Sequence, residues 1–149
     1  MGTVPNEIVS LVELQNIDFD SNKLTGTIPE LGNLLELFAI DMDDNGFTGK
    51  IPDSFYGSTS LVTIDLDSNA LTGTLSSQIG TIELLNILML ENNKLVGPIP
   101  TELGNLEPLE FLTLDDNEFT GAIPSELGML TKLRKFLILR CYLQMCQSN

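Results

Sequence analysis

The sequence predicts a solenoid, a fold in which similar short coils stack on one another. One observation is a recurring string that starts at Asn22, Asn45, Asn69, Asn93 and Asn117, so that successive copies begin 23, 24, 24 and 24 residues apart. The other is an apolar residue eight, five and three positions before each asparagine, such as Leu14, Ile17 and Phe19 before Asn22. Repeats of this length bury a continuous core by stacking.

The apolar spacing predicts a short strand before each asparagine. Side chains alternate between the two faces of a strand, so the residues five and three positions before the asparagine share the core face. The residues four and two positions before it then point to the opposite face. In the second repeat this rule places Ile40 and Met42 in the core, and Asp41 and Asp43 on the surface.

Composition excludes several classes of function. The chain has 149 residues, with 21 acidic side chains against 7 basic ones and a net charge of −14, so it repels nucleic acids and anionic membrane surfaces. It contains no histidine, which removes Ser-His and Cys-His nucleophiles and imidazole metal ligands. No apolar run reaches the roughly 18 residues that a membrane-spanning helix requires. We therefore expect no nucleic-acid partner and no membrane insertion by this chain.

The combined pattern L-x-x-L-x-L-x-x-N-x-L-T-G-x-I-P resembles the plant-type leucine-rich repeats of receptor-like proteins and receptor kinases. The resemblance extends from Gly2 to about Leu143 and includes a degenerate sixth copy with Cys141 at the asparagine position. It implies an α/β solenoid: a right-handed superhelix of about six coils with a parallel β-sheet on its concave face. Residues 1–149 are then a single domain. Because the chain starts inside a repeat, we expect it to be a fragment of a longer protein.

Other positions of the repeat have structural explanations. An asparagine turned inward can satisfy unpaired backbone groups of adjacent coils, which predicts a ladder of hydrogen bonds along the solenoid. The five repeated Gly mark tight turns. The convex side of the core is expected to be closed by Leu31, Phe55, Ile79, Leu103 and Leu127.

The candidate binding surface is an acidic concave face. Neighbouring parallel strands are ~4.8 Å apart, so the aspartates of successive coils should stack, and their repulsion has to be offset by a cation, a basic partner or salt. The candidate partner-binding residues are Asp18, Asp20, Asp41, Asp43, Asp44, Asp65, Asp67, Met89, Glu91, Phe111, Asp115 and Asp116. Farther along the chain, Met89 and Phe111 make this face more apolar.

Several alternatives stay open at the level of sequence. The acidic face is either a docking surface for a cationic protein or peptide, or a solvated face adapted to salt. Calcium binding at Asp18, Asp41, Asp43 and Asp65 is a further possibility, although no EF-hand loop is present. No catalytic residue and no cofactor is expected, because solvated aspartates lack an apolar pocket that raises one pKa above its neighbour. Cys141 and Cys146 form either a terminal disulfide or two free thiols.

The resemblance implies a non-enzymatic recognition module that is extracellular or at the cell surface and binds a protein or peptide. The alternatives are an inhibitor-like, matrix or ice-binding protein of the same repeat type, or a calcium-binding adhesion module. Open ends of the solenoid also allow two copies to associate end to end.

Overall fold

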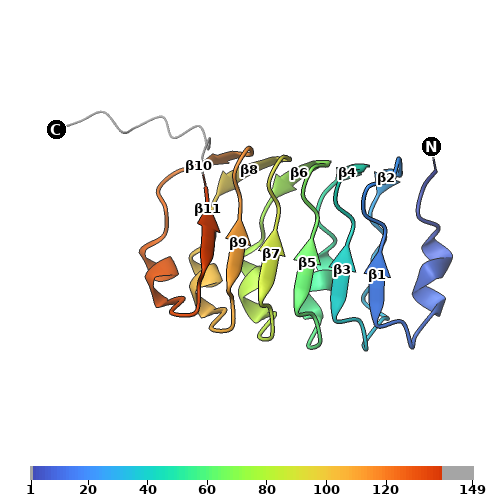
Figure 1. Ribbon diagram of the computed structural model, residues 1–149, viewed down its shortest axis with the longest axis horizontal. Coiled ribbons are helices and arrows are strands. Elements are labelled where there is room, and N and C mark those ends of the chain that lie inside the picture. Colours follow the sequence, from blue (N-terminus) through green and yellow to red (C-terminus); the bar gives the residue numbers. More distant parts are fainter. Residues whose placement is uncertain (1, 139–149) are drawn as a thin grey trace.

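The computed structural model describes residues 2–138, which form a stack of coils in a right-handed leucine-rich-repeat solenoid (Figure 1). Each coil contributes one strand to a first sheet and, after a turn, most coils contribute a strand to a second sheet. The predictions for Cys141 and Cys146 lie outside the described residues.

The first sheet has six parallel strands in chain order, one per coil, and forms the concave face. Its backbone register follows the repeat, so that Ile17 pairs with Ile40 and Ile40 with Ile64. The strands are β1 (Asn16–Asp18), β3 (Ala39–Asp41), β5 (Thr63–Asp65), β7 (Ile87–Met89), β9 (Phe111–Thr113) and β11 (Lys135–Leu137).

A second parallel sheet of five strands follows the asparagine of each coil. The sequence pattern predicted only a tight turn there, and the repeated glycines do adopt left-handed conformations, with φ between 81° and 88°, within or next to these strands. The strands are β2 (Thr25–Thr27), β4 (Gly46–Gly49), β6 (Ala70–Thr74), β8 (Lys94–Pro98) and β10 (Glu118–Thr120).

Short 3-10 helices line the remaining side of the solenoid (Figure 1). They are η1 (Asn6–Ser10), η2 (Asp53–Gly57), η3 (Ser77–Thr81), η4 (Thr101–Asn105) and η5 (Ser125–Met129). A proline directly precedes four of them, where its fixed φ suits the start of a helix. The second coil has turns in place of a helix between Pro29 and Leu37.

The core lies between the two sheets and the helices, and it contains the residues that the repeat predicts. Ile40 and Met42 are 0% exposed, and the five residues predicted to close the convex side are all buried. The end coils depart from this pattern. Phe136, at a predicted core position, is 37% exposed, because it belongs to the last described strand and no further strand covers it.

The repeated asparagines join neighbouring coils. The side-chain oxygen of Asn93 accepts the backbone N–H of Leu71 at 2.9 Å, and its amide donates to the carbonyl of Leu66 at 2.9 Å. Equivalent pairs of bonds to the preceding coil are made by Asn45, Asn69 and Asn117. Asn22 instead donates only to carbonyls of its own coil, those of Phe19 and Asp20.

Candidate functional site

The concave sheet presents three outward positions per coil. They stand six, four and two residues before each asparagine, because the residues between them point into the core. Most of the sequence-based candidates occupy the second and third positions; Phe111 occupies the first, and Asp44 and Asp116 directly precede their asparagines. The sequence identified only Phe111 at the first position, because the apolar pattern alone did not show where each strand begins. It carries Asn16, Ala39, Thr63, Ile87, Phe111 and Lys135.

The acidic candidates of the first three coils come together in rows. Asp18 pairs in register with Asp41, and Asp41 with Asp65. Beyond the strands the same alignment continues through backbone hydrogen bonds, since Ser21 N–H donates to the carbonyl of Asp43 and Asp44 N–H to that of Asp67. Asp20, Asp43 and Asp67 therefore form a second row beside the first. Six carboxyl groups are gathered over three coils.

Burial on the sheet, together with this crowding, raises the pKa of three carboxyl groups. Desolvation is the largest cause for each, and the charges of neighbouring aspartates add to it. The pKa of Asp41 is raised, that of Asp43 is raised to about 6, and that of Asp65 to about 8. The expectation that a solvated aspartate face would lack such raised pKa values is therefore wrong, because the strands and packed side chains shield part of it from water.

Hydrogen bonds within the cluster are few. Asp41 and Asp65 each accept the backbone N–H of the residue two positions on, at 3.5 Å and 3.3 Å. The hydroxyl of Ser68 donates to Asp67 at 3.0 Å. One buried carboxylate oxygen of Asp43 has no hydrogen-bond partner in the structure. The cluster therefore retains acceptor capacity for a cationic group.

The other half of the concave face is more apolar. Ile87 and Met89 of β7, Phe111 of β9 and Leu137 of β11 are all half-buried on this side. Thr113 is fully buried, and its hydroxyl donates to the carboxylate of Glu91. The second acidic row, that of Asp20, Asp43 and Asp67, thus continues at Glu91 and Asp115. Beside it lies an apolar patch made of Ile87, Met89, Phe111 and Leu137.

Two of the predicted acidic residues lie in turns beyond the strand ends. Asp44 and Asp116 have φ of 46° and 50°, as do their equivalents Ser21, Ser68 and Asn92 within a few degrees. Short polar residues are those that best tolerate this left-handed conformation. Backbone geometry therefore accounts for the residue type at this position, and these two side chains lie at the edge of the face.

Within residues 2–138, the basic residues of the concave sheet are confined to β11 and the residue directly before it. The guanidinium of Arg134 lies 3.1 Å from the carboxylate of Glu110. Lys135 follows in the row that contains Phe111. The sheet therefore changes from acidic at β1, β3 and β5 to apolar and partly basic at β11.

No preformed metal site or membrane-spanning helix occurs in the described part of the chain. Among residues 2–138, no three acidic or thiol side chains converge in a way that could hold a metal ion. The calcium alternative at Asp18, Asp41, Asp43 and Asp65 therefore has no arranged set of ligands. The same residues contain no helix long and apolar enough to cross a membrane.

Comparison with known families agrees with this geometry. The family model described as Leucine Rich Repeat matches residues 13–34, 36–58, 84–106 and 108–130, which is more than half of the chain. The chain belongs to the leucine-rich-repeat family. No curated protein sequence matches this leucine-rich-repeat chain significantly.

Solved structures of plant receptors resemble the leucine-rich-repeat chain over most of its length. The plant peptide hormone receptor RGFR1, in complex with RGF2, has 38% identity and a TM-score of 0.90, with 92% of this chain and 22% of the receptor chain covered. The Arabidopsis receptor kinase HAESA, in complex with the peptide hormone IDA and the co-receptor SERK1, has 28% identity and a TM-score of 0.88, covering 92% and 23%. This chain thus spans less than a quarter of these receptors.

A plant ice-binding protein is also similar. It has 32% identity and a TM-score of 0.81, with 85% of this chain and 42% of that protein covered. The leucine-rich-repeat scaffold therefore occurs both in peptide hormone receptors and in an ice-binding protein. The function of this chain has to be argued from its own surface.

Proposed function

We propose that this chain is a non-enzymatic, extracellular recognition module that binds an extended peptide or protein segment along its concave face. The observation that carries the proposal is the division of that face into an acidic half and an apolar half. The receptors RGFR1 and HAESA, whose structures resemble the chain, were solved with peptide hormones, and this supports the peptide class of ligand.

The dimensions of the sheet suit a short peptide. From β1 to β11 there are five inter-strand spacings of about 4.8 Å, or about 24 Å in all. An extended peptide covers this distance with about seven residues, since each adds at most about 3.5 Å. The segment in contact with the face is thus short enough to lie across all six strands.

The charge of the face specifies the ligand further. Lys or Arg side chains over β1, β3 and β5 would pair with Asp18, Asp41 and Asp65 and offset their mutual repulsion. Apolar side chains over β7 and β9 would bury Met89 and Phe111. We therefore propose a ligand with basic residues at one end and apolar residues at the other.

Selection from a random peptide library on the intact chain tests this proposal. We expect the selected peptides to combine Lys or Arg with apolar residues in separate halves. Asp41→Asn together with Asp65→Asn should abolish the selection of basic residues. The matched control is Asp53→Asn, on η2 and away from the concave face. Peptides without a basic half, or equal loss in both variants, would overturn the proposal.

Binding to an ice surface is a second candidate. It is favoured by threonines that recur at one position of the second sheet, three residues after the asparagine, and by the similarity to the plant ice-binding protein. These are Thr25, Thr48, Thr72 and Thr120, and Val96 interrupts the series. Inhibition of ice recrystallisation that is lost in Thr48→Lys and retained in Asp41→Asn would favour this candidate over peptide recognition.

A further inference from the structure

Asn45 differs from the other ladder asparagines in the residue that follows it. The next residue is glycine in this coil, whereas the other four asparagines precede Lys23, Ala70, Lys94 and Glu118. An asparagine side chain can cyclise with the backbone nitrogen of the next residue, and glycine hinders this reaction least because it has no Cβ. Asn45–Gly46 is also the one Asn-Gly pair in the 149-residue sequence. Asn45 is therefore the ladder asparagine that is chemically most reactive.

The fold itself does not demand glycine at position 46. Gly46 is not among the residues with a positive φ, and the equivalent position of the third coil holds Ala70. A Cβ atom added at Gly46 would lie 3.1 Å from the carbonyl oxygen of Leu24, a tight contact that a shift of a few tenths of an ångström relieves. Alanine can therefore replace this glycine in a test variant.

Leu24 of the first coil holds both groups that would react. Its N–H donates to the side-chain oxygen of Asn45 at 2.9 Å, and its carbonyl accepts the N–H of Gly46 at 2.8 Å. The amide nitrogen of Asn45 is fixed as well, since it donates to the carbonyls of Phe19 and Asp43 at 2.9 Å and 2.8 Å. While Leu24 stays in place, the Gly46 nitrogen cannot turn towards the side-chain carbon of Asn45.

The first coil is held less firmly than the inner coils. Its apolar residues eight and three positions before the asparagine and two positions after it are only partly buried; they are Leu14, Phe19 and Leu24. The equivalent residues of the third coil are at most 2% exposed. Asn22 also donates only to carbonyls of its own coil. Segments with few buried contacts open locally before the whole chain unfolds, so we expect the contact between Leu24 and the second coil to open first.

We propose that Asn45–Gly46 is a deamidation site that is closed while Leu24 is in place and opens when the first coil separates from the second. In the open state the deprotonated Gly46 nitrogen attacks the side-chain carbon of Asn45. A carbon–nitrogen bond forms, and ammonia leaves as the bond to the amide nitrogen breaks. Water then opens the resulting cyclic imide and gives aspartate or isoaspartate. The reaction concerns the ladder, so the proposal does not depend on the proposed function.

The product cannot rebuild the contact between the two coils. A carboxylate has no N–H to donate, so at this position it would face the carbonyl oxygens of Phe19, Met42 and Asp43 that accept from the amide. Isoaspartate also adds a methylene group to the main chain directly before β4, which shifts the register of β4 with β2. A single opening event is thereby converted into lasting release of the first coil.

Peptide mapping by mass spectrometry tests the chemistry on the full chain. At one mildly alkaline pH, we expect Asn45 to deamidate in urea before every other ladder asparagine, and at least about 10-fold more slowly in buffer than in urea. Gly46→Ala should slow the reaction in urea by about 10-fold or more. Gly128→Ala, where nothing lies within 4 Å of the added atom, is the matched control and should leave the rate unchanged. Equal rates in buffer and urea, or an unchanged rate in Gly46→Ala, would overturn the proposal.

Amide hydrogen exchange tests the role of Leu24. In the natural chain, the N–H groups of Leu24 and Gly46 should exchange at similar rates, and at least about 10-fold faster than the N–H of Leu95, which is bonded to Asn117 in the same way. Asn45→Asp, which has the side chain of one product, should lose protection at Leu24 and keep it at Leu95. Exchange of Leu24 no faster than that of Leu95, or full protection of Leu24 in Asn45→Asp, would contradict the proposed gate.

Two core variants test whether local opening controls the rate. Ile17→Ala removes a buried side chain from the first coil and should speed deamidation in buffer by about 10-fold. Leu112→Ala, the equivalent change on β9, should speed it by less than about 2-fold. Equal acceleration by the two variants would show that only global unfolding exposes the site, and would overturn the proposal. Hydrogen exchange of the natural chain decides the matter if Ile17→Ala fails to fold.

Discussion

Asp41 and Asp65 are direct partners on neighbouring parallel strands, and the pKa of each carboxyl group is raised. Desolvation is the main cause, and the charge of Asp41 contributes to the shift of Asp65. The folded protein thus holds these groups where their charged forms are disfavoured. A basic ligand would remove this penalty, which is why the cluster indicates binding more strongly than it indicates stability.

The first prediction concerns stability and pH. The pKa values of Asp43 and Asp65, about 6 and about 8, lie above the ordinary aspartate value of 3.8. Between the ordinary value and the raised values, the folded state binds more protons than the unfolded state. The free energy of unfolding therefore falls as pH rises through this interval. We expect the thermal midpoint to decrease from about pH 5 to about pH 8 at constant ionic strength.

Variants assign this slope to individual residues. Asp65→Asn should flatten the decrease over the whole range, and Asp43→Asn should flatten it only below about pH 6, because each group contributes between its unfolded and folded pKa values. Glu118→Gln, an exposed change on β10, serves as the control and should leave the slope as it is. A thermal midpoint that rises with pH over this range would contradict the account of the acidic cluster.

The second prediction concerns the asparagine ladder. Asn93→Ala removes bonds to Leu71 and Leu66 of the preceding coil and leaves their buried backbone groups unpaired, which should cost about 2–4 kcal/mol. Asn22→Ala is the matched control. Its bonds stay within its own exposed coil, so the cost should be below about 1 kcal/mol. Denaturant unfolding measures both, and equal costs would show that inter-coil bonding is not the role of the ladder.

The third prediction concerns the spacing between helices of successive coils. A Cβ atom added at Gly104 would lie 2.5 Å from the carbonyl oxygen of Glu126, which is backbone and cannot move aside cheaply. Gly104→Ala should therefore destabilise the protein by about 1–3 kcal/mol. At Gly128 nothing lies within 4 Å of the added atom, so Gly128→Ala should be near neutral. Chemical denaturation of the two variants provides the comparison.

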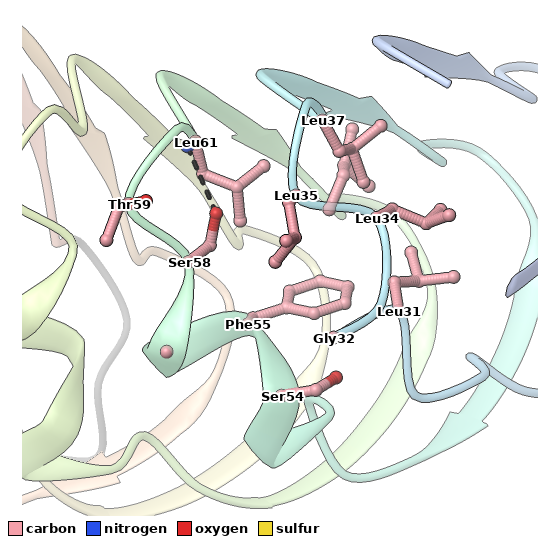
Figure 2. Close-up of a pocket in the computed structure, with 12 residues that line it drawn as sticks. Leu31, Gly32, Leu34, Leu35, Leu37, Ser54, Phe55, Ser58, Thr59 and Leu61 are labelled. Carbon is pink, nitrogen blue, oxygen red and sulfur yellow. Dashed lines mark hydrogen bonds between the residues drawn. The ribbon is translucent and has the colours of Figure 1, made fainter. Parts of the chain in front are cut away.

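The fourth prediction concerns the pocket of about 120 Å³ that lies beside η2, between the second and third coils (Figure 2). Ser58→Leu should raise the free energy of unfolding by about 1–2 kcal/mol, because it restores an aliphatic side chain where other coils have one. Ile82→Ser makes the opposite change at the equivalent buried position and should cost about 3 kcal/mol or more. Destabilisation by Ser58→Leu would mean that the loss of the hydrogen bonds from the Ser60 and Leu61 N–H groups to the Ser58 hydroxyl outweighs the gain in packing.

The repeat pattern was sufficient to predict the sheet, its register and the core. Ile40 and Met42 are buried and Asp41 lies between them on the surface because strand alternation allows only two faces. The second sheet was missed, since the pattern at its glycines is equally typical of a turn. The outward row with Ile87 and Phe111 was mostly missed because the spacing of apolar residues within the repeat does not show at which residue each strand begins.

Properties that arise from packing could not be predicted from the sequence. The raised pKa of Asp65 depends on how far the fold removes that carboxyl group from water. The pocket beside η2 did have a signal in the sequence, in the short spacing from Asn22 to Asn45 and in Ser58. Its volume and the unpaired Ser54 hydroxyl required the coordinates of both coils.

The most direct test of concave-face recognition is the affinity of a selected peptide for two variants at low and at high salt. Asp41→Asn with Asp65→Asn neutralises two of the six carboxyl groups of the acidic half, and Met89→Gln with Phe111→Gln makes two of the four residues of the apolar patch polar. We expect the first variant to lose most of the salt dependence of binding, and the second to bind more weakly by a similar factor at both salt concentrations. Affinity that is unchanged in both variants would contradict recognition through this face.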